Sequence, residues 1–197
     1  MYKLGITGGI GSGKTTASSY LKKKFEAYVF DADTESKNLL LNSTILQRRL
    51  INTFGNKITK GRKINLSLLA NEVFESKLNQ ELINGIMWPE IYLLIQETMK
   101  QLKNSENLFI VDAALIYEAN IQSLFDSTLL ITSTKENRLY RNSNKKRLSI
   151  EQFTKRMALQ MSDRKKTLIA DKTITNNQSL TDFHKKLDSF YKNIINL

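Results

Sequence analysis

The stretch Gly8-Gly9-Ile10-Gly11-Ser12-Gly13-Lys14-Thr15 decides the fold, because it follows a short apolar run and leads into an amphipathic segment. Its spacing fits the phosphate-binding loop template of Gly, four residues and then Gly-Lys-Ser/Thr. Glycines let the backbone curl so that successive N–H groups face a polyphosphate, and the following helix adds its positive N-terminal end. A plain glycine-rich turn between a strand and a helix is the alternative.

The loop predicts Mg·ATP as the bound nucleotide. Lys14 is expected to reach the β- and γ-phosphates, and Thr15 is expected to ligate Mg²⁺. The other loop residues expected to contact the nucleotide are Gly9, Gly11, Ser12, Gly13 and Thr16.

The segments around the loop predict an α/β fold of the P-loop NTPase or kinase type. A buried strand at residues 2–7 precedes the loop, and residues 14–25 carry apolar side chains at helical spacing. Further strands are expected at residues 28–30, 108–111, 128–131 and 172–175. Strands that alternate with helices in this way predict a mostly parallel five-stranded sheet.

A long helical stretch separates the second and third expected strands. Asn65 or Ser67 caps a helix that runs to about residue 87, Pro89 interrupts it, and a second helix follows at 91–102. Residues 38–63 are polar and less regular, with a short helix near 46–54. This is more than a crossover needs, so we expect one domain over 1–197 with an inserted helical subdomain that covers a substrate. The expected parts are a core at 1–35, 106–134 and 168–197, the helical subdomain at 36–105 and a basic helical lid at 135–167.

Positive charge is concentrated in one part of the chain. The net charge is +11 and the isoelectric point is about 9.7. Residues 135–166 hold eleven basic and three acidic side chains, a net charge of +8, which leaves about +3 for the rest. Such a cluster can hold a polyphosphate or a nucleic acid, and a solvated lysine-rich face is the third possibility.

Carboxylates follow two of the expected strands. Asp31 and Asp33 lie just past the second strand, at the edge where open α/β sheets bind ligands, so a catalytic base is expected there. Either residue could instead cap a helix that begins near Thr34. Asp112 ends the third strand and resembles a Walker B carboxylate near Mg²⁺.

Composition narrows the class of protein. The chain has no cysteine, which excludes disulfides and thiolate metal sites and suits a reducing compartment. The loop begins at residue 8, so no signal peptide is expected, and no apolar run approaches the ~20 residues that span a bilayer. We therefore expect a cytoplasmic protein without a membrane partner, as a monomer or weak homo-oligomer.

Several signatures are missing from the sequence. It has no Asn-Lys-x-Asp guanine motif and no ABC-type ATPase signature. A small-molecule kinase remains, with an ATP-dependent nucleic-acid-binding protein as the rival from another class.

The assembled motifs resemble the dephospho-CoA kinase family over nearly the whole chain. The residues that carry the resemblance are 4–16, Asp31-Ala32-Asp33, 112–118, Arg141, 156–160 and Ala170-Asp171 with Asn176. The family phosphorylates the ribose 3′-hydroxyl of dephospho-CoA, the last step of coenzyme A synthesis. The resemblance implies that Asp33 is the base, Arg141 is a lid arginine facing the phosphates, and Asn176 borders the adenine of ATP. It also implies a small-molecule acceptor and no nucleic acid, with a nucleoside or nucleotide kinase as the alternative enzyme.

The chain departs from the family pattern at three places. Trp88-Pro89 stands where the family usually has His-Pro, so a substrate contact from that histidine is not carried over. Ala114-Leu115-Ile116-Tyr117-Glu118 replaces the usual Pro-Leu-Leu-Phe-Glu, a milder change. Lys145 replaces a second lid arginine, which keeps the charge and loses the bidentate fork.

Overall fold

The computed structural model describes residues 1–61, 63–102, 107–145 and 148–195. They divide into two compact units, Met1–Phe30 with Leu102–Leu197 and Asp31–Gln101. The helical subdomain expected at 36–105 overlaps the second of these units, Asp31–Gln101.

The first unit is built on a parallel five-stranded sheet with strand order β2-β5-β1-β6-β7, which confirms the predicted α/β fold. Its strands are β1 (Tyr2–Thr7), β2 (Tyr28–Asp31), β5 (Leu108–Asp112), β6 (Ser127–Thr132) and β7 (Lys172–Thr175). In the centre, Leu4 of β1 pairs with Ile110 of β5 and with Ser127 of β6. Because the strands are parallel, the residues that follow β1, β5, β6 and β7 meet at one edge of the sheet.

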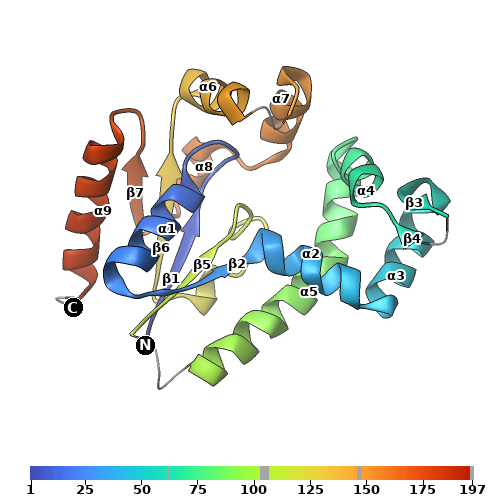
Figure 1. Ribbon diagram of the computed structural model, residues 1–197, viewed down its shortest axis with the longest axis horizontal. Helices are drawn as coiled ribbons and strands as arrows, with labels where there is room; N and C mark the ends of the chain where they lie inside the picture. The colour runs from blue at the N-terminus through green and yellow to red at the C-terminus, as the bar shows by residue number, and fades with distance from the viewer. Residues whose placement is uncertain (62, 103–106, 146–147, 196–197) are drawn as a thin grey trace. The chain divides into compact units, whose positions relative to one another are not determined.

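Helices of the first unit cover the sheet and extend past its carboxyl edge (Figure 1). They are α1 (Lys14–Phe25), α6 (Lys135–Lys145), α7 (Ile150–Leu159), α8 (Asp163–Thr167) and α9 (Leu180–Ile195). Leu21 of α1 and Leu187 of α9 are fully buried in one apolar cluster with Leu4, Ile6 and Ile131 of the strands. The predicted amphipathic faces of the first and last helices therefore pack on the sheet.

The second unit is mainly helical and more regular than its sequence predicted. Its elements are α2 (Ala32–Asn42), α3 (Thr44–Phe54), a 3₁₀ turn (Asn56–Ile58), β3 (Thr59–Lys60), β4 (Lys63–Ile64), α4 (Leu66–Val73) and α5 (Lys77–Leu102). The antiparallel β3–β4 pair was not predicted, because two-residue strands carry no period that a sequence can show. Leu46, Leu50 and Phe54 of α3 pack in an apolar core with Leu69 and Val73 of α4.

The prediction that Pro89 ends a helix is wrong. Helix α5 runs through Pro89, and the break lies instead after Val73, where Ser76 accepts a bond from the Asn79 amide at 3.1 Å and starts α5. Pro89 lacks the N–H that would bond the Gly85 carbonyl and its ring crowds that carbonyl, and Figure 1 shows α5 bending along its length. Buried Met87 and Ile91 on either side of Pro89 stabilise both halves by packing. Asn65, one of the two predicted caps, accepts bonds from Ser67 and Leu68.

Candidate active site

The loop between β1 and α1 has a backbone that glycine permits. Gly8, Gly11 and Gly13 have φ angles of 149°, 77° and 109°, which side chains strongly disfavour. Gly13 precedes α1 in a left-handed conformation, and neither a side-chain cap nor an acidic residue occupies the first turn. The N–H groups of the first turn of α1 and the positive end of its dipole can therefore face an anion.

Neighbouring side chains press closely against this loop. A Cβ atom on Gly9 would overlap the Arg138 guanidinium, and a Cβ on Gly13 would overlap the Asn176 amide nitrogen. The Ser12 hydroxyl is buried and has no hydrogen-bond partner among the described residues. A curled glycine backbone with an unmet buried hydroxyl fits a bound polyphosphate.

Two residues expected to contact the nucleotide hold the loop backbone. Arg141 Nη1 donates to the carbonyl oxygens of Gly11 and Ser12, both at 3.2 Å. Its Nη2 donates to the Asn176 carbonyl at 2.7 Å, and Asn176 Nδ2 donates to the Ser12 carbonyl at 2.9 Å. Burial, and secondarily the charge of Arg138, lower the pKa of Arg141. Arg141 and Asn176 thus stabilise the carbonyls on which the loop shape depends.

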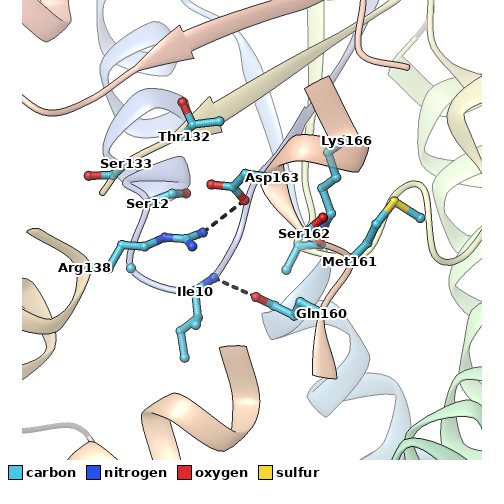
Figure 2. A network of polar contacts seen from close by, with 12 residues as sticks. Ile10, Ser12, Thr132, Ser133, Arg138, Gln160, Met161, Ser162, Asp163 and Lys166 are labelled. Carbon is cyan, nitrogen blue, oxygen red and sulfur yellow. Dashed lines mark hydrogen bonds and ion pairs between the residues drawn. The ribbon is translucent and has the colours of Figure 1, made fainter. Parts of the chain in front are cut away.

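A third support comes from the segment that follows α7. Gln160 Oε1 accepts a hydrogen bond of 2.8 Å from the Ile10 amide (Figure 2). The sequence included Gln160 in a motif without giving it a role. No local pattern marks this contact, because Ile10 and Gln160 are 150 positions apart.

The structure joins the two predicted Mg²⁺ residues through a third. The Ser18 hydroxyl donates to Asp112 Oδ2 at 2.8 Å, and its longer contact of 3.2 Å goes to the Thr15 carbonyl. Asp112 is buried at the end of β5, whereas Thr15 is exposed in the first turn of α1. The sequence did not single out Ser18, although it lies one helical turn after Thr15.

The acidic pair after β2 separates into two roles. Asp31 caps α2, since its Oδ1 accepts bonds from the amides of Asp33 and Thr34 at 3.1 and 3.2 Å. Its Oδ2 also accepts a 2.8 Å bond from the Thr34 hydroxyl. Asp33 lies in the first turn of α2 with an exposed side chain. The cap is therefore Asp31, and the Asp33 carboxylate projects to solvent from the second unit.

Comparison with known proteins decides the family. A family model described as dephospho-CoA kinase matches residues 2–182. The chain belongs to the dephospho-CoA kinase family. A dephospho-CoA kinase of Fusobacterium nucleatum is 35% identical over 193 residues, which cover 97% of each chain. A dephospho-CoA kinase of Streptococcus mutans is 32% identical and covers 98% of each.

Solved structures agree with this membership. A dephospho-CoA kinase from Campylobacter jejuni has a TM-score of 0.67 at 25% identity, covering 98% of this chain and 96% of that one. A Thermus thermophilus protein has a TM-score of 0.81 at 26% identity, covering 98% and 97%. A shikimate kinase from Acinetobacter baumannii, at 16% identity and a TM-score of 0.57, shares the fold.

One departure from the dephospho-CoA kinase pattern has a structural explanation. Tyr117, which stands at the family's usual Phe, is buried, and its hydroxyl donates to Thr128 Oγ1 at 2.8 Å. Thr128 in turn donates to Asp171 Oδ2 at 2.6 Å. The added hydroxyl is thus satisfied inside the core. We expect Lys146 and Arg147 at the outer turn of the basic helical lid, but both lie outside the described residues.

A buried ion pair between Lys166 and Glu118 could not be predicted from the sequence of this member of the dephospho-CoA kinase family. Lys166 is fully buried, and its Nζ lies 2.9 Å from Glu118 Oε1 and donates to the Ala114 carbonyl at 2.8 Å. Burial lowers the pKa of Lys166, and the attraction of Glu118 opposes that effect. In the sequence Lys166 was one basic residue among eleven, because a charge pattern predicts an exposed face and not a buried pair.

Proposed function

We propose that the protein transfers the γ-phosphoryl group of Mg·ATP to the ribose 3′-hydroxyl of dephospho-CoA, giving coenzyme A and ADP. One observation carries the proposal. The glycine loop, held by Arg141 and Asn176, lies in a chain that matches the dephospho-CoA kinase model over residues 2–182. Mass spectrometry and phosphorus NMR of the product formed from dephospho-CoA and Mg·ATP test it. A phosphoryl group on the ribose 3′ oxygen is the expected result, and an unphosphorylated acceptor contradicts it.

The chain's own groups then have distinct roles in an in-line transfer. Asp33 orients the attacking 3′-hydroxyl and accepts its proton. Lys14 and the loop N–H groups stabilise charge on the transferring phosphate, and Arg141 contributes its charge and keeps the loop in shape. The nucleotide contacts are assigned to Gly9, Gly11, Ser12, Gly13 and Thr16, with Asn176 acting through Ser12. We propose that Thr15 and Asp112, which accepts a bond from Ser18, would hold Mg²⁺, and the bound ion would supply positive charge at the phosphates.

We propose that the second unit, which carries Asp33 and Trp88, binds the acceptor, and that α6, α7 and α8 form a lid that excludes water. Among the described residues no helix is long and apolar enough to cross a bilayer. A cytoplasmic monomer or weak homo-oligomer remains our expectation, and sedimentation of the purified protein measures its assembly.

The rival reading is an ATP-dependent nucleic-acid-binding protein, because residues 135–166 carry a net charge of +8. A gel-shift titration of duplex DNA against salt separates the two readings. We expect only weak binding that falls steeply with salt, as counterion release dictates. Tight DNA binding at physiological salt, without dephospho-CoA-dependent ADP release, would favour the rival.

Arg141→Ala is expected to lower kcat/KM for ATP by a factor on the order of 10². Two loop carbonyls lose their hydrogen-bond donor, and the site loses a positive charge. Arg141→Lys is expected to recover little, since one ammonium group cannot replace the planar fork. The exposed Arg164 provides a charge-matched control, and Arg164→Ala should change steady-state rates little. Equal, small effects of the Arg141 and Arg164 changes would indicate that the basic cluster is only a solvated face.

Trp88, the only tryptophan, reports on the acceptor. It is half-buried in α5, one residue before Pro89. If its indole lies against the adenine or ribose of dephospho-CoA, stacking contributes ~1 to 3 kcal/mol and its emission shifts or is quenched on binding. We expect a saturable change with dephospho-CoA and a smaller one with Mg·ATP. A flat dephospho-CoA titration, where calorimetry confirms binding, would leave Trp88 a packing role only.

A further inference from the structure

Arg138 of α6 lies directly against the phosphate-binding loop. The residue is only 7% exposed, and its guanidinium occupies the space that a Cβ on Gly9 would need. A Cβ on Gly11 would lie 3.2 Å from Arg138 Cβ, so both ends of the side chain contact the loop. Figure 2 shows the side chain reaching past the loop between Ser12 and Ile10 toward Asp163. A full positive charge is therefore held, almost without solvent, where the loop is expected to receive phosphates.

The hydrogen bonds of this guanidinium are incompletely satisfied. An arginine side chain has five N–H donors. Arg138 Nη2 pairs with Asp163 Oδ1 at a long 3.3 Å, while Nε is buried and has no hydrogen-bond partner among the described residues. Unmet donors on a buried cation are costly, so an anion that meets them gains stabilisation.

Arg141 provides the contrast. Its two terminal nitrogens already donate to three carbonyl oxygens and to the Ser133 hydroxyl, so its charge can act on the phosphates but it has little capacity for a further hydrogen bond. Burial and, secondarily, the charge of Arg138 lower the pKa of Arg141, as expected for two neighbouring cations. An anion next to Arg138 would relieve the repulsion between them.

Asp163 is a weak partner for Arg138. It is the first residue of the short helix α8, its side chain is 25% exposed, and it meets Arg138 through one 3.3 Å contact. One contact of this length leaves much of the buried charge of Arg138 uncompensated. A polyphosphate carries more charge and more acceptor oxygens, and bidentate pairing with phosphate suits a guanidinium.

We propose that Arg138 donates to the polyphosphate of bound ATP, and that Asp163 holds the guanidinium in place and competes with the phosphates for it. The proposal rests on the loop being the nucleotide site, as proposed above. It adds a phosphate-binding residue to Lys14 and the loop amides.

Calorimetric titration of Mg·ATP into three variants tests the proposal. Arg138→Gln is expected to raise the Kd for ATP about tenfold or more, the usual effect of losing a hydrogen bond to a charged group. Arg138→Lys keeps the charge without the fork, so its Kd should lie between wild type and Arg138→Gln. Asp163→Asn removes the competing charge and is expected to lower the Kd by about twofold or more. Lys23→Gln, the same charge change on an exposed side chain in the last turn of α1, should leave the Kd unchanged.

The opposite signs at Arg138 and Asp163 distinguish phosphate binding from a structural bridge between α6 and α8. If the pair only joined these helices, both changes would weaken ATP binding and lower the melting temperature together, which would overturn the proposal. An unchanged Kd in Arg138→Gln would also overturn it. The same loss of affinity for inorganic tripolyphosphate is expected, and a loss confined to ATP would contradict a phosphate contact. Failure of the wild-type protein to bind ATP would instead refute the nucleotide site itself.

Discussion

Lys14→Ala is expected to lower kcat by a factor on the order of 10² or more with the fold intact. Lys14 begins α1 directly after the glycine loop, and its ammonium group provides a contact that strengthens as the γ-phosphoryl group transfers. Steady-state ADP release and circular dichroism measure the two parts of the result. Lys23→Ala, in the last turn of the same helix with an exposed side chain, is the matched control and should behave as wild type. Near-wild-type turnover in Lys14→Ala would contradict the assignment of this loop as the phosphate-binding site.

The second large effect is expected at Asp33. As the base, Asp33→Asn should lower kcat by a factor on the order of 10² or more, with nearly unchanged ATP affinity and melting temperature. Asp31→Ala is the companion variant, because Asp31 caps α2 through two backbone amides. Its loss should cost about 1 kcal/mol in the free energy of unfolding. If Asp33→Asn instead lowered the melting temperature and left kcat unchanged, Asp33 would be a structural residue and the base would lie elsewhere.

The sheet of the first unit could be predicted because its signals are local. A few consecutive residues are enough to identify the strand at residues 2–7, the glycine loop and the apolar run ending at Asp112. The rules for connecting parallel strands then join these segments into one sheet. The same local signals predict the wrong helix end at Pro89, because packing of Met87 and Ile91 overrides the helix-breaking tendency of one residue. Local propensity is a weak guide where tertiary contacts decide.

The supporting contacts of the site could not be predicted for the same reason. Arg141 was singled out by its resemblance to a family position, but its bonds to Gly11 and Ser12 join residues about 130 positions apart. Lys166 and Arg138 looked like members of a solvated basic stretch, yet one is fully buried beside Glu118 and the other is 7% exposed against the loop. Net charge locates such a cluster and does not say which of its members face inward.

The central claim is that dephospho-CoA is the phosphoryl acceptor. Coupled ADP release, measured with dephospho-CoA, adenosine, AMP and other nucleosides at equal concentration, tests it most directly. Interactions with the acceptor that strengthen in the transition state appear in kcat/KM, so this ratio is the quantity to compare. We predict a kcat/KM for dephospho-CoA that exceeds those of the other acceptors by a factor on the order of 10² or more. An equal or higher kcat/KM for adenosine, AMP or another nucleoside would contradict the claim and make the protein a nucleoside or nucleotide kinase.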